Sequence, residues 1–127
     1  MGRISICKKF KFDAAHHLPE YDGPCQRVHG HTFHLEVMVT GEIQDQGHKS
    51  GMIMDFGDLK RLVNRVIIDR YDHQDLNTIF INPTAENMIG FMAIELLHEI
   101  TVCNLPIFLV RLRLYETEDS YVEWRTI

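Results

Sequence analysis

The chain has 127 residues and a formal net charge of −5 at pH 7. This length suits a single domain, residues 1–127, with one hydrophobic core. A mildly acidic chain lacks the electrostatic attraction that nucleic acid or an anionic membrane requires, so we expect neither as a partner. Hydrophobic residues make up 45% of the chain and charged residues 24%, which is typical of a soluble globular protein.

The cysteine content and the N-terminus both bear on location. Three cysteines, Cys7, Cys25 and Cys103, are an odd number and form no CxxC motif, which favours a reducing compartment over a disulfide framework. The first residues contain no apolar stretch of the kind found in signal peptides. No apolar run is long enough to span a bilayer. We therefore expect a cytoplasmic protein.

Residue patterns in the first half predict two strands and a loop between them. Apolar and polar residues alternate over residues 3–12, which predicts a half-buried strand. Residues 13–30 contain prolines and glycines together with several metal-ligand residue types, and we expect a loop there. A second strand is predicted over residues 31–43. The polar stretch over residues 41–51 is expected to be a surface excursion.

In the next part of the chain, apolar residues recur at helical spacing. The first helix is expected to begin at Asp55 and to end near Tyr71, and the second to begin at Thr84, its predicted N-cap. Pro106 ends the second helix.

Two more strands are predicted near the C-terminus. Alternation over residues 108–115 predicts a strand that ends in Glu116, followed by a short strand over residues 121–125. Four apolar residues share one parity in the longer strand and are expected to face inward: Phe108, Val110, Leu112 and Leu114. The order strand-strand-helix-helix-strand-strand predicts an α+β fold, an antiparallel sheet with two helices on one face. Because such a small sheet leaves its edges exposed, we also expect oligomerisation.

Two histidines at the entry of the second strand are candidate metal ligands. His29 and His31 are two residues apart, so on a strand they share one face. His16 offers a third imidazole, and three histidines with an open fourth position are typical of catalytic zinc. Cys25 is either a fourth ligand or a nearby thiolate that takes part in the chemistry. The alternative is that the histidines only form hydrogen bonds at a strand entry.

Other polar residues allow both a structural and a functional interpretation. Asp72 and His73 form either a favourable charge at a helix C-terminus or a carboxylate that orients a proton-shuttling imidazole. Glu116 has the parity of the inward-facing residues, where it would need a donor such as a ligand amidine, but it could also be a solvated carboxylate. Four further histidines are expected to be structural, packing or surface residues: His17, His34, His48 and His98.

Six short motifs occur in a fixed order along almost the whole chain. They are Phe12-x-Ala14-Ala15-His16, Cys25-x-x-x-His29-Gly30-His31, Asp55-Phe56-x-x-Leu59-Lys60, Asp72-His73-x-x-Leu76-Asn77, Pro83-Thr84-x-Glu86-Asn87 and Glu116-Thr117. In this order they resemble the 6-pyruvoyltetrahydropterin synthase superfamily. The resemblance implies the tunnelling fold (T-fold), in which such units assemble into an oligomeric barrel, often a hexamer of two trimers.

The resemblance also implies a site. One zinc ion per subunit is expected on three histidines, namely His16, His29 and His31. Cys25 is implied as the general base or acid at the substrate side chain, with Asp72 and His73 relaying its proton.

Three further residues are implied in substrate binding. Glu116 is expected to hold the pterin ring and to take part in the catalytic relay, while Thr84 and Glu86 line the pterin end of the pocket. One departure from the family pattern is His17, where a basic residue such as arginine is frequent.

The gap of three residues between Cys25 and His29 resembles the carboxytetrahydropterin branch, which belongs to queuosine (7-deazaguanine) biosynthesis. This branch implies a lyase that converts 7,8-dihydroneopterin triphosphate to 6-carboxy-5,6,7,8-tetrahydropterin and releases acetaldehyde and triphosphate. Alternatives are a 6-pyruvoyltetrahydropterin synthase, a related enzyme that cuts the side chain for folate synthesis, and a non-catalytic pterin- or purine-binding module.

Overall fold

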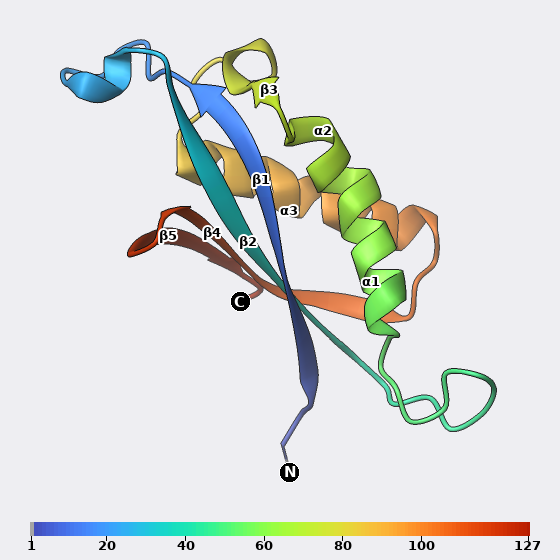
Figure 1. Cartoon of the computed structure of the whole chain (residues 1–127). Coiled ribbons are helices and arrows are strands. Elements are labelled where there is room, and N and C mark those ends of the chain that lie inside the picture. Colours follow the sequence, from blue (N-terminus) through green and yellow to red (C-terminus); the bar gives the residue numbers. More distant parts are fainter. Residues whose placement is uncertain (1) are drawn as a thin grey trace.

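Two long antiparallel strands, β1 (Ser5–His16) and β2 (His29–Gly41), form the centre of the fold (Figure 1). The computed structural model describes residues 2–127. β4 (Ile107–Thr117) pairs antiparallel with β2, and β5 (Ser120–Arg125) pairs antiparallel with β4. The resulting five-stranded sheet has the order β3-β1-β2-β4-β5, and its helices lie on one face. The predicted α+β architecture is confirmed.

The loop predicted over residues 13–30 is shorter than expected. β1 continues to His16 and β2 begins at His29, and the two strands pair without a break from Ser5 opposite Thr40 to His16 opposite His29. Asp13, Ala14 and Ala15 have low strand propensity, but an unbroken ladder of backbone hydrogen bonds overrides it. The real loop is confined to residues 17–28.

A fifth strand was not predicted. β3 (Gln74–Asp75) has only two residues and pairs parallel with Ala14 and Ala15 at the outer edge of β1. It makes the sheet mixed rather than purely antiparallel. A strand of two residues is too short to show alternation in the sequence.

The first helical segment is one rod with an irregular middle. It comprises α1 (Phe56–Val63), the π-helical turn η2 (Asn64–Ile68) and α2 (Asp69–Tyr71). Its N-cap is Asp55, whose side chain accepts a hydrogen bond from the Gly57 N–H at 2.6 Å. Such a cap satisfies one of the N–H groups that a helix start leaves free.

The second helix, α3 (Ala85–Val102), crosses the same face of the sheet. Its predicted N-cap is confirmed, because the Thr84 hydroxyl accepts a hydrogen bond from the Asn87 N–H at 3.1 Å. None of the described helices is both long and apolar enough to cross a bilayer.

The core lies between the sheet and the helices. Its largest fully buried side chains come from both layers: Tyr71, Phe12, Phe33, Leu35, Leu59, Ile67, Leu76, Met88, Met92, Leu96, Leu112 and Leu114. Inward and outward residues alternate at the ends of β1 and β2 nearest the loop, and the inward series continues past the core to His16 on one strand and to His31 on the other. Beyond the apolar core, the same face of the sheet therefore carries histidines.

The prediction for the inward face of β4 was half wrong. The register shifts by one residue opposite Met38 and Val39, which leaves Val110 as the extra residue of a β-bulge. As a result, Leu109 is buried and Phe108 is 71% exposed, whereas Leu112 and Leu114 face inward as predicted.

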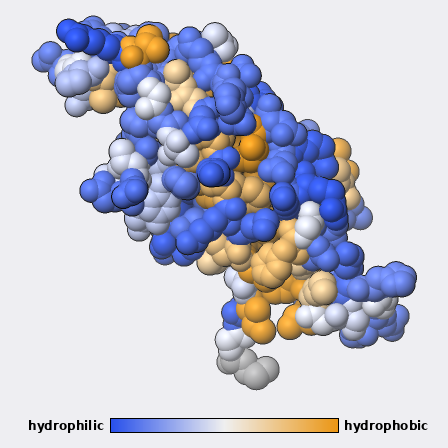
Figure 2. All heavy atoms as spheres, in the orientation of Figure 1, coloured by the Kyte–Doolittle hydropathy of each residue, from blue (hydrophilic) through white to orange (hydrophobic). Residues whose placement is uncertain are grey.

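Apolar side chains gather at the lower end of the molecule in Figure 2, close to where the chain begins. A hollow there is lined by Ile4, Ile43, Met52 and Phe56, all of which are exposed. It lies at the opposite end of β1 from His16.

Candidate functional site

Strand register brings three histidines together. His16 at the end of β1 lies directly opposite His29 at the start of β2, and His31 is the next residue of β2 on the same face. The ring centroid of His16 lies 4.6 Å from that of His29 and 5.2 Å from that of His31. The ring centroids of His29 and His31 are 4.7 Å apart.

Two backbone carbonyls orient these rings. His16 Nδ1 lies 2.8 Å from the Pro83 carbonyl oxygen, and His29 Nδ1 lies 2.7 Å from that of Arg27. A carbonyl oxygen only accepts, so each Nδ1 carries the hydrogen and each neutral ring leaves a lone pair on Nε2. The Nε2 atoms of all three histidines are buried, and none has a hydrogen-bond partner within residues 2–127.

A carboxylate completes the cluster. Glu116 Oε1 lies 3.1 Å from His16 Nε2 and 3.2 Å from His31 Nε2. One ligand atom from each of His16, His29, His31 and Glu116 lies within 4.8 Å of the others. Three nitrogen lone pairs and a carboxylate facing one point repel each other unless a proton or a metal cation lies between them. This donor set fits a divalent metal ion such as zinc.

The pKa values of the cluster reflect burial and mutual contact. Burial lowers the pKa of His16, but the Glu116 carboxylate and the Pro83 carbonyl outweigh it and raise this pKa above its usual value. Burial dominates for His31 and lowers its pKa. The His16 imidazole lowers the pKa of Glu116 although the carboxyl group is partly buried. Glu116 is therefore ionised near neutral pH and adds negative charge to the cluster.

Asp72 and His73 form a second group at the outer edge of β1. Asp72 Oδ2 lies 3.0 Å from His73 Nδ1, while Asp72 Oδ1 accepts a hydrogen bond from the Asp13 N–H at 2.9 Å. This backbone hydrogen bond is the main reason why the pKa of Asp72 is lowered. His73 has a left-handed backbone with φ of 60°, and its side chain is 77% exposed. The predicted carboxylate–imidazole contact is thus present.

Cys25 lies in a short 3-10 turn, η1 (Pro24–Gln26), within the loop that joins β1 to β2. It is half-buried, and its carbonyl oxygen accepts a hydrogen bond from the Leu18 N–H at 2.8 Å. Its thiol belongs neither to the histidine–glutamate cluster nor to the group around Asp72 and His73. All three cysteines are free, and Cys7 and Cys103 are exposed rather than buried as small apolar residues usually are.

A shallow hollow lies between His31 of the cluster and His73 of the second group. Its volume is about 550 Å³, and it is lined by residues of β1, β2 and β3 together with His73. Among the lining residues are Asp13 of β1 and His31 of β2. A ligand in this hollow would contact His31 of β2 and His73 at once.

The remaining predicted residues lie near the start of α3. The Thr84 hydroxyl is engaged in capping the helix, and Glu86 is exposed in its first turn, where a carboxylate also interacts favourably with the helix dipole. Sequence analysis missed the roles of Pro83, Arg27 and Asp13, because each acts through backbone atoms that every residue has.

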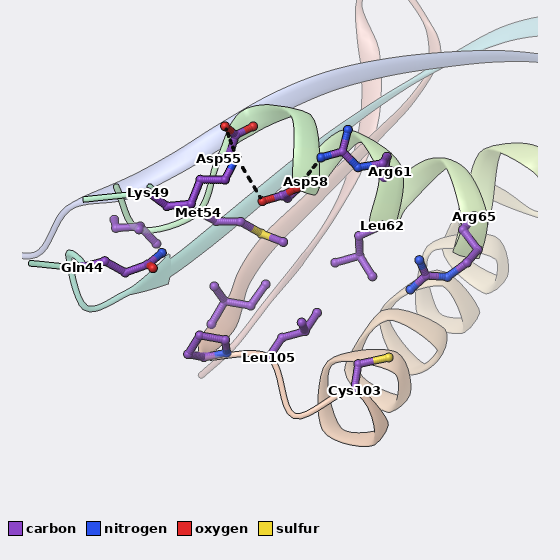
Figure 3. A pocket seen from close by; sticks show the side chains of 13 residues that line it. Gln44, Lys49, Met54, Asp55, Asp58, Arg61, Leu62, Arg65, Cys103 and Leu105 are labelled. Carbon is purple, nitrogen blue, oxygen red and sulfur yellow. Dashed lines mark hydrogen bonds and ion pairs between the residues drawn. The ribbon is translucent and has the colours of Figure 1, made fainter. Parts of the chain in front are cut away.

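The hollow in Figure 3 lies at the other end of the sheet, between α1, the loop after β2 and the turn before β4. Its volume is about 550 Å³ and none of the predicted site residues lines it. Its cations are already paired: Lys49 Nζ lies 2.9 Å from Asp55, and Arg65 lies 2.7 Å from Glu99. We therefore place the candidate site at the histidines.

The chain is similar to known proteins over almost its whole length. A model of the family described as 6-pyruvoyl tetrahydropterin synthase matches residues 5–126. The chain is 34% identical to the 6-carboxy-5,6,7,8-tetrahydropterin synthase of Haemophilus influenzae, over 96% of this chain and 99% of the relative. It is 41% identical to the dihydroneopterin monophosphate aldolase of Pyrococcus furiosus, over 95% and 96%. The solved 6-pyruvoyl tetrahydropterin synthase of Caenorhabditis elegans superposes with a TM-score of 0.79 at 25% identity, with both chains fully covered.

Proposed function

The chain belongs to the 6-pyruvoyl tetrahydropterin synthase family, and on this premise we propose that it is a zinc-dependent 6-carboxytetrahydropterin synthase. Its proposed reaction converts 7,8-dihydroneopterin triphosphate to 6-carboxy-5,6,7,8-tetrahydropterin, with release of acetaldehyde and triphosphate. The product would serve queuosine and other 7-deazaguanine biosynthesis.

One observation carries the proposal: three buried imidazole Nε2 atoms, free of hydrogen bonds within the described chain, face a single point. His16, His29 and His31 would hold the ion, and the carbonyls of Pro83 and Arg27 keep two of the rings in the ligand tautomer. When bound, zinc supplies a Lewis acid that stabilises negative charge on the side-chain oxygens of the substrate.

Proton transfer falls to the cysteine and the Asp72–His73 pair. We assign Cys25 as the base that removes a proton from the side-chain carbon next to the pterin ring. His73 would take this proton onward, and Asp72 at 3.0 Å stabilises the imidazolium that forms. Electrons from that carbon reduce the dihydropterin ring, so no nicotinamide or flavin is needed. The exposed position of His73 leaves it free to approach a substrate.

Substrate recognition falls to acidic and hydroxyl groups at the same end of the sheet. The pterin ring offers an amino group and a ring N–H side by side, which one carboxylate can accept together. We assign this contact to Glu116, whose low pKa keeps it ionised. Thr84 and Glu86, at the start of α3, would line the pterin end of the pocket.

The final step of the carboxy branch needs only water as co-reactant. Loss of triphosphate and the internal redox change leave two adjacent carbonyl groups on the side chain. Water cleaves the bond between them: its oxygen enters the carboxylate that stays on the pterin, and its proton goes to the departing acyl carbon, which leaves as acetaldehyde. A pyruvoyl synthase stops before this step.

A second candidate reaction is aldol cleavage of a dihydroneopterin phosphate. It is favoured by the Pyrococcus furiosus relative, which is the more similar of the two sequences compared above at 41% identity. Aldol cleavage would break the side chain between its first two carbons and release the phosphate on the two-carbon aldehyde. No ring reduction would occur.

Product mass distinguishes these reactions. Zinc-loaded protein is incubated separately with dihydroneopterin triphosphate and with the monophosphate, and the pterin products are weighed by mass spectrometry. We expect a 6-carboxytetrahydropterin and acetaldehyde from the triphosphate. A 6-pyruvoyl product, or a hydroxymethyl pterin from the monophosphate, would replace the proposed reaction by the corresponding alternative. No turnover of either substrate would favour a binding module.

We also propose that the protein is a homo-oligomer, a trimer or a hexamer built from trimers. Support comes from the sheet edges: within the described chain β5 has no outer neighbour, and β1 has one only at Ala14 and Ala15. Such edges tend to pair with another strand. Light scattering after size-exclusion chromatography is expected to give three or six times the mass of one chain, and a monomeric mass would contradict this.

A further inference from the structure

Asn77 belongs to one of the family motifs, but the proposed reaction gives it no role. Its carboxamide binds both backbone groups of His17: Asn77 Oδ1 accepts from the His17 N–H at 2.9 Å, and Asn77 Nδ2 donates to the His17 carbonyl at 3.0 Å. A neighbouring strand would offer the same donor and acceptor. The Asn77 side chain therefore replaces a strand partner for this one residue.

The position of this contact between the Asn77 carboxamide and the His17 backbone, here called the clamp, matters because His17 directly follows His16, a proposed metal ligand. Pairing between β1 and β2 ends at His16 opposite His29, and β3 covers the other edge of β1 only at Ala14 and Ala15. Strand ends without backbone partners fray readily. By holding His17, Asn77 extends ordered backbone one residue beyond His16.

The turn that carries Asn77 is itself held in place by contacts. Asn77 lies in the 3-10 turn η3 (Leu76–Thr78), and its own N–H donates to Asp75 Oδ1 at 3.1 Å. Leu76, in the same turn, is fully buried in the core and so fixes the turn against it. The hydrogen bond to Asp75 and the burial of Leu76 therefore hold the turn, and with it the Asn77 side chain, in place.

Further contacts reach β1 from the same stretch of chain, residues 72–83. The His73 N–H donates to the Asp13 carbonyl at 2.6 Å, and the Pro83 carbonyl accepts from His16 Nδ1 at 2.8 Å. One segment thus fixes the backbone before His16, the ring of His16 and, through Asn77, the backbone after it.

We propose that Asn77 is a positioning residue for the metal centre, which holds His16 in place through the His17 backbone. This inference rests on the proposed function, because it requires that the histidines bind zinc. Removing groups that orient a ligand typically weakens metal binding by 10–100-fold. Since Asn77 acts one residue away from the ligand, we expect a loss of about tenfold, at the lower end of that range.

The test measures metal binding in Asn77→Ala against a matched control. Thr40→Val is that control, because the Thr40 hydroxyl donates to the Ile4 carbonyl at 2.6 Å and so ties β1 at its opposite end. Zinc affinity is measured by competition with a chromophoric chelator, and the cobalt-substituted proteins are compared by visible absorption. Thermal unfolding of the metal-free proteins reports any general loss of stability.

We expect Asn77→Ala to bind zinc about tenfold more weakly and to show a changed cobalt spectrum, whereas Thr40→Val loses stability but keeps both metal properties. Wild-type zinc affinity and an unchanged spectrum in Asn77→Ala would overturn the inference alone. A wild-type protein that binds no zinc would overturn the proposed function and this inference with it.

If Asn77→Ala does not fold, Asn77→Asp is measured in the same way. This variant keeps the acceptor for the His17 N–H but cannot donate to the His17 carbonyl. Its added negative charge favours a cation, so weaker zinc binding would report lost geometry, and unweakened binding would overturn the inference.

Discussion

Replacing His29 with alanine is expected to remove zinc and to reduce turnover by on the order of a thousandfold. The substitution takes one of three converging Nε2 atoms from the cluster and leaves His16 and His31 as the remaining imidazole ligands. Lewis-acid stabilisation of developing charge contributes several kcal/mol, and each 1.4 kcal/mol is about tenfold in rate. Elemental analysis of the purified variant measures the zinc content, and triphosphate release measures turnover.

Two matched variants sharpen this prediction. His34→Ala removes an exposed histidine from the opposite face of the same strand and is expected to keep zinc. Glu116→Gln separates the two roles open to that carboxylate, because a pterin-binding residue can be changed without loss of metal. We expect this variant to retain zinc and to lose pterin binding. Full zinc occupancy in His29→Ala would contradict the proposed ligand set.

The sequence was sufficient to predict that His29 and His31 lie together, and the reason is periodicity. Two histidines two residues apart on a strand must share a face, and the observed register then places His16 opposite His29. What the sequence could not provide was the register itself and the carbonyls that orient the rings. Those carbonyls belong to Pro83 and Arg27, but they are backbone groups, so the identity of the side chain carries no signal for them.

The case of β4 shows how far alternation can be trusted. Apolar residues alternate evenly from Phe108 to Leu114, yet the extra residue at Val110 reverses the facing of everything before it. Glu116 faces the histidines, as its parity predicted. It lies on the same side of the Val110 bulge as Leu112 and Leu114, although the pairing of β4 with β5 shifts register once more between Tyr115 and Thr117. A bulge is set by the pairing of two strands, and only the structure contains that pairing.

Cys25→Ala is expected to lose turnover by on the order of a thousandfold while it keeps zinc and pterin binding. General acid–base groups contribute about 10²- to 10⁴-fold to a reaction rate. The Cys25 thiol lies outside the histidine–glutamate cluster, so its removal leaves all proposed ligands in place. The loop is held by backbone, through the bond from the Leu18 N–H to the Cys25 carbonyl, and this bond survives the substitution.

Cys7→Ala and Cys103→Ala are the controls for Cys25→Ala, because both replace exposed thiols in other parts of the chain. They are expected to react at the wild-type rate. Zinc is measured by elemental analysis, pterin binding by fluorescence and turnover by triphosphate release. Loss of zinc from Cys25→Ala would make the thiol a metal ligand instead of a base. Turnover at the wild-type rate would remove it from the chemistry and leave the Asp72–His73 pair as the proton acceptor, since His73, which contacts Asp72, lines the hollow beside His31.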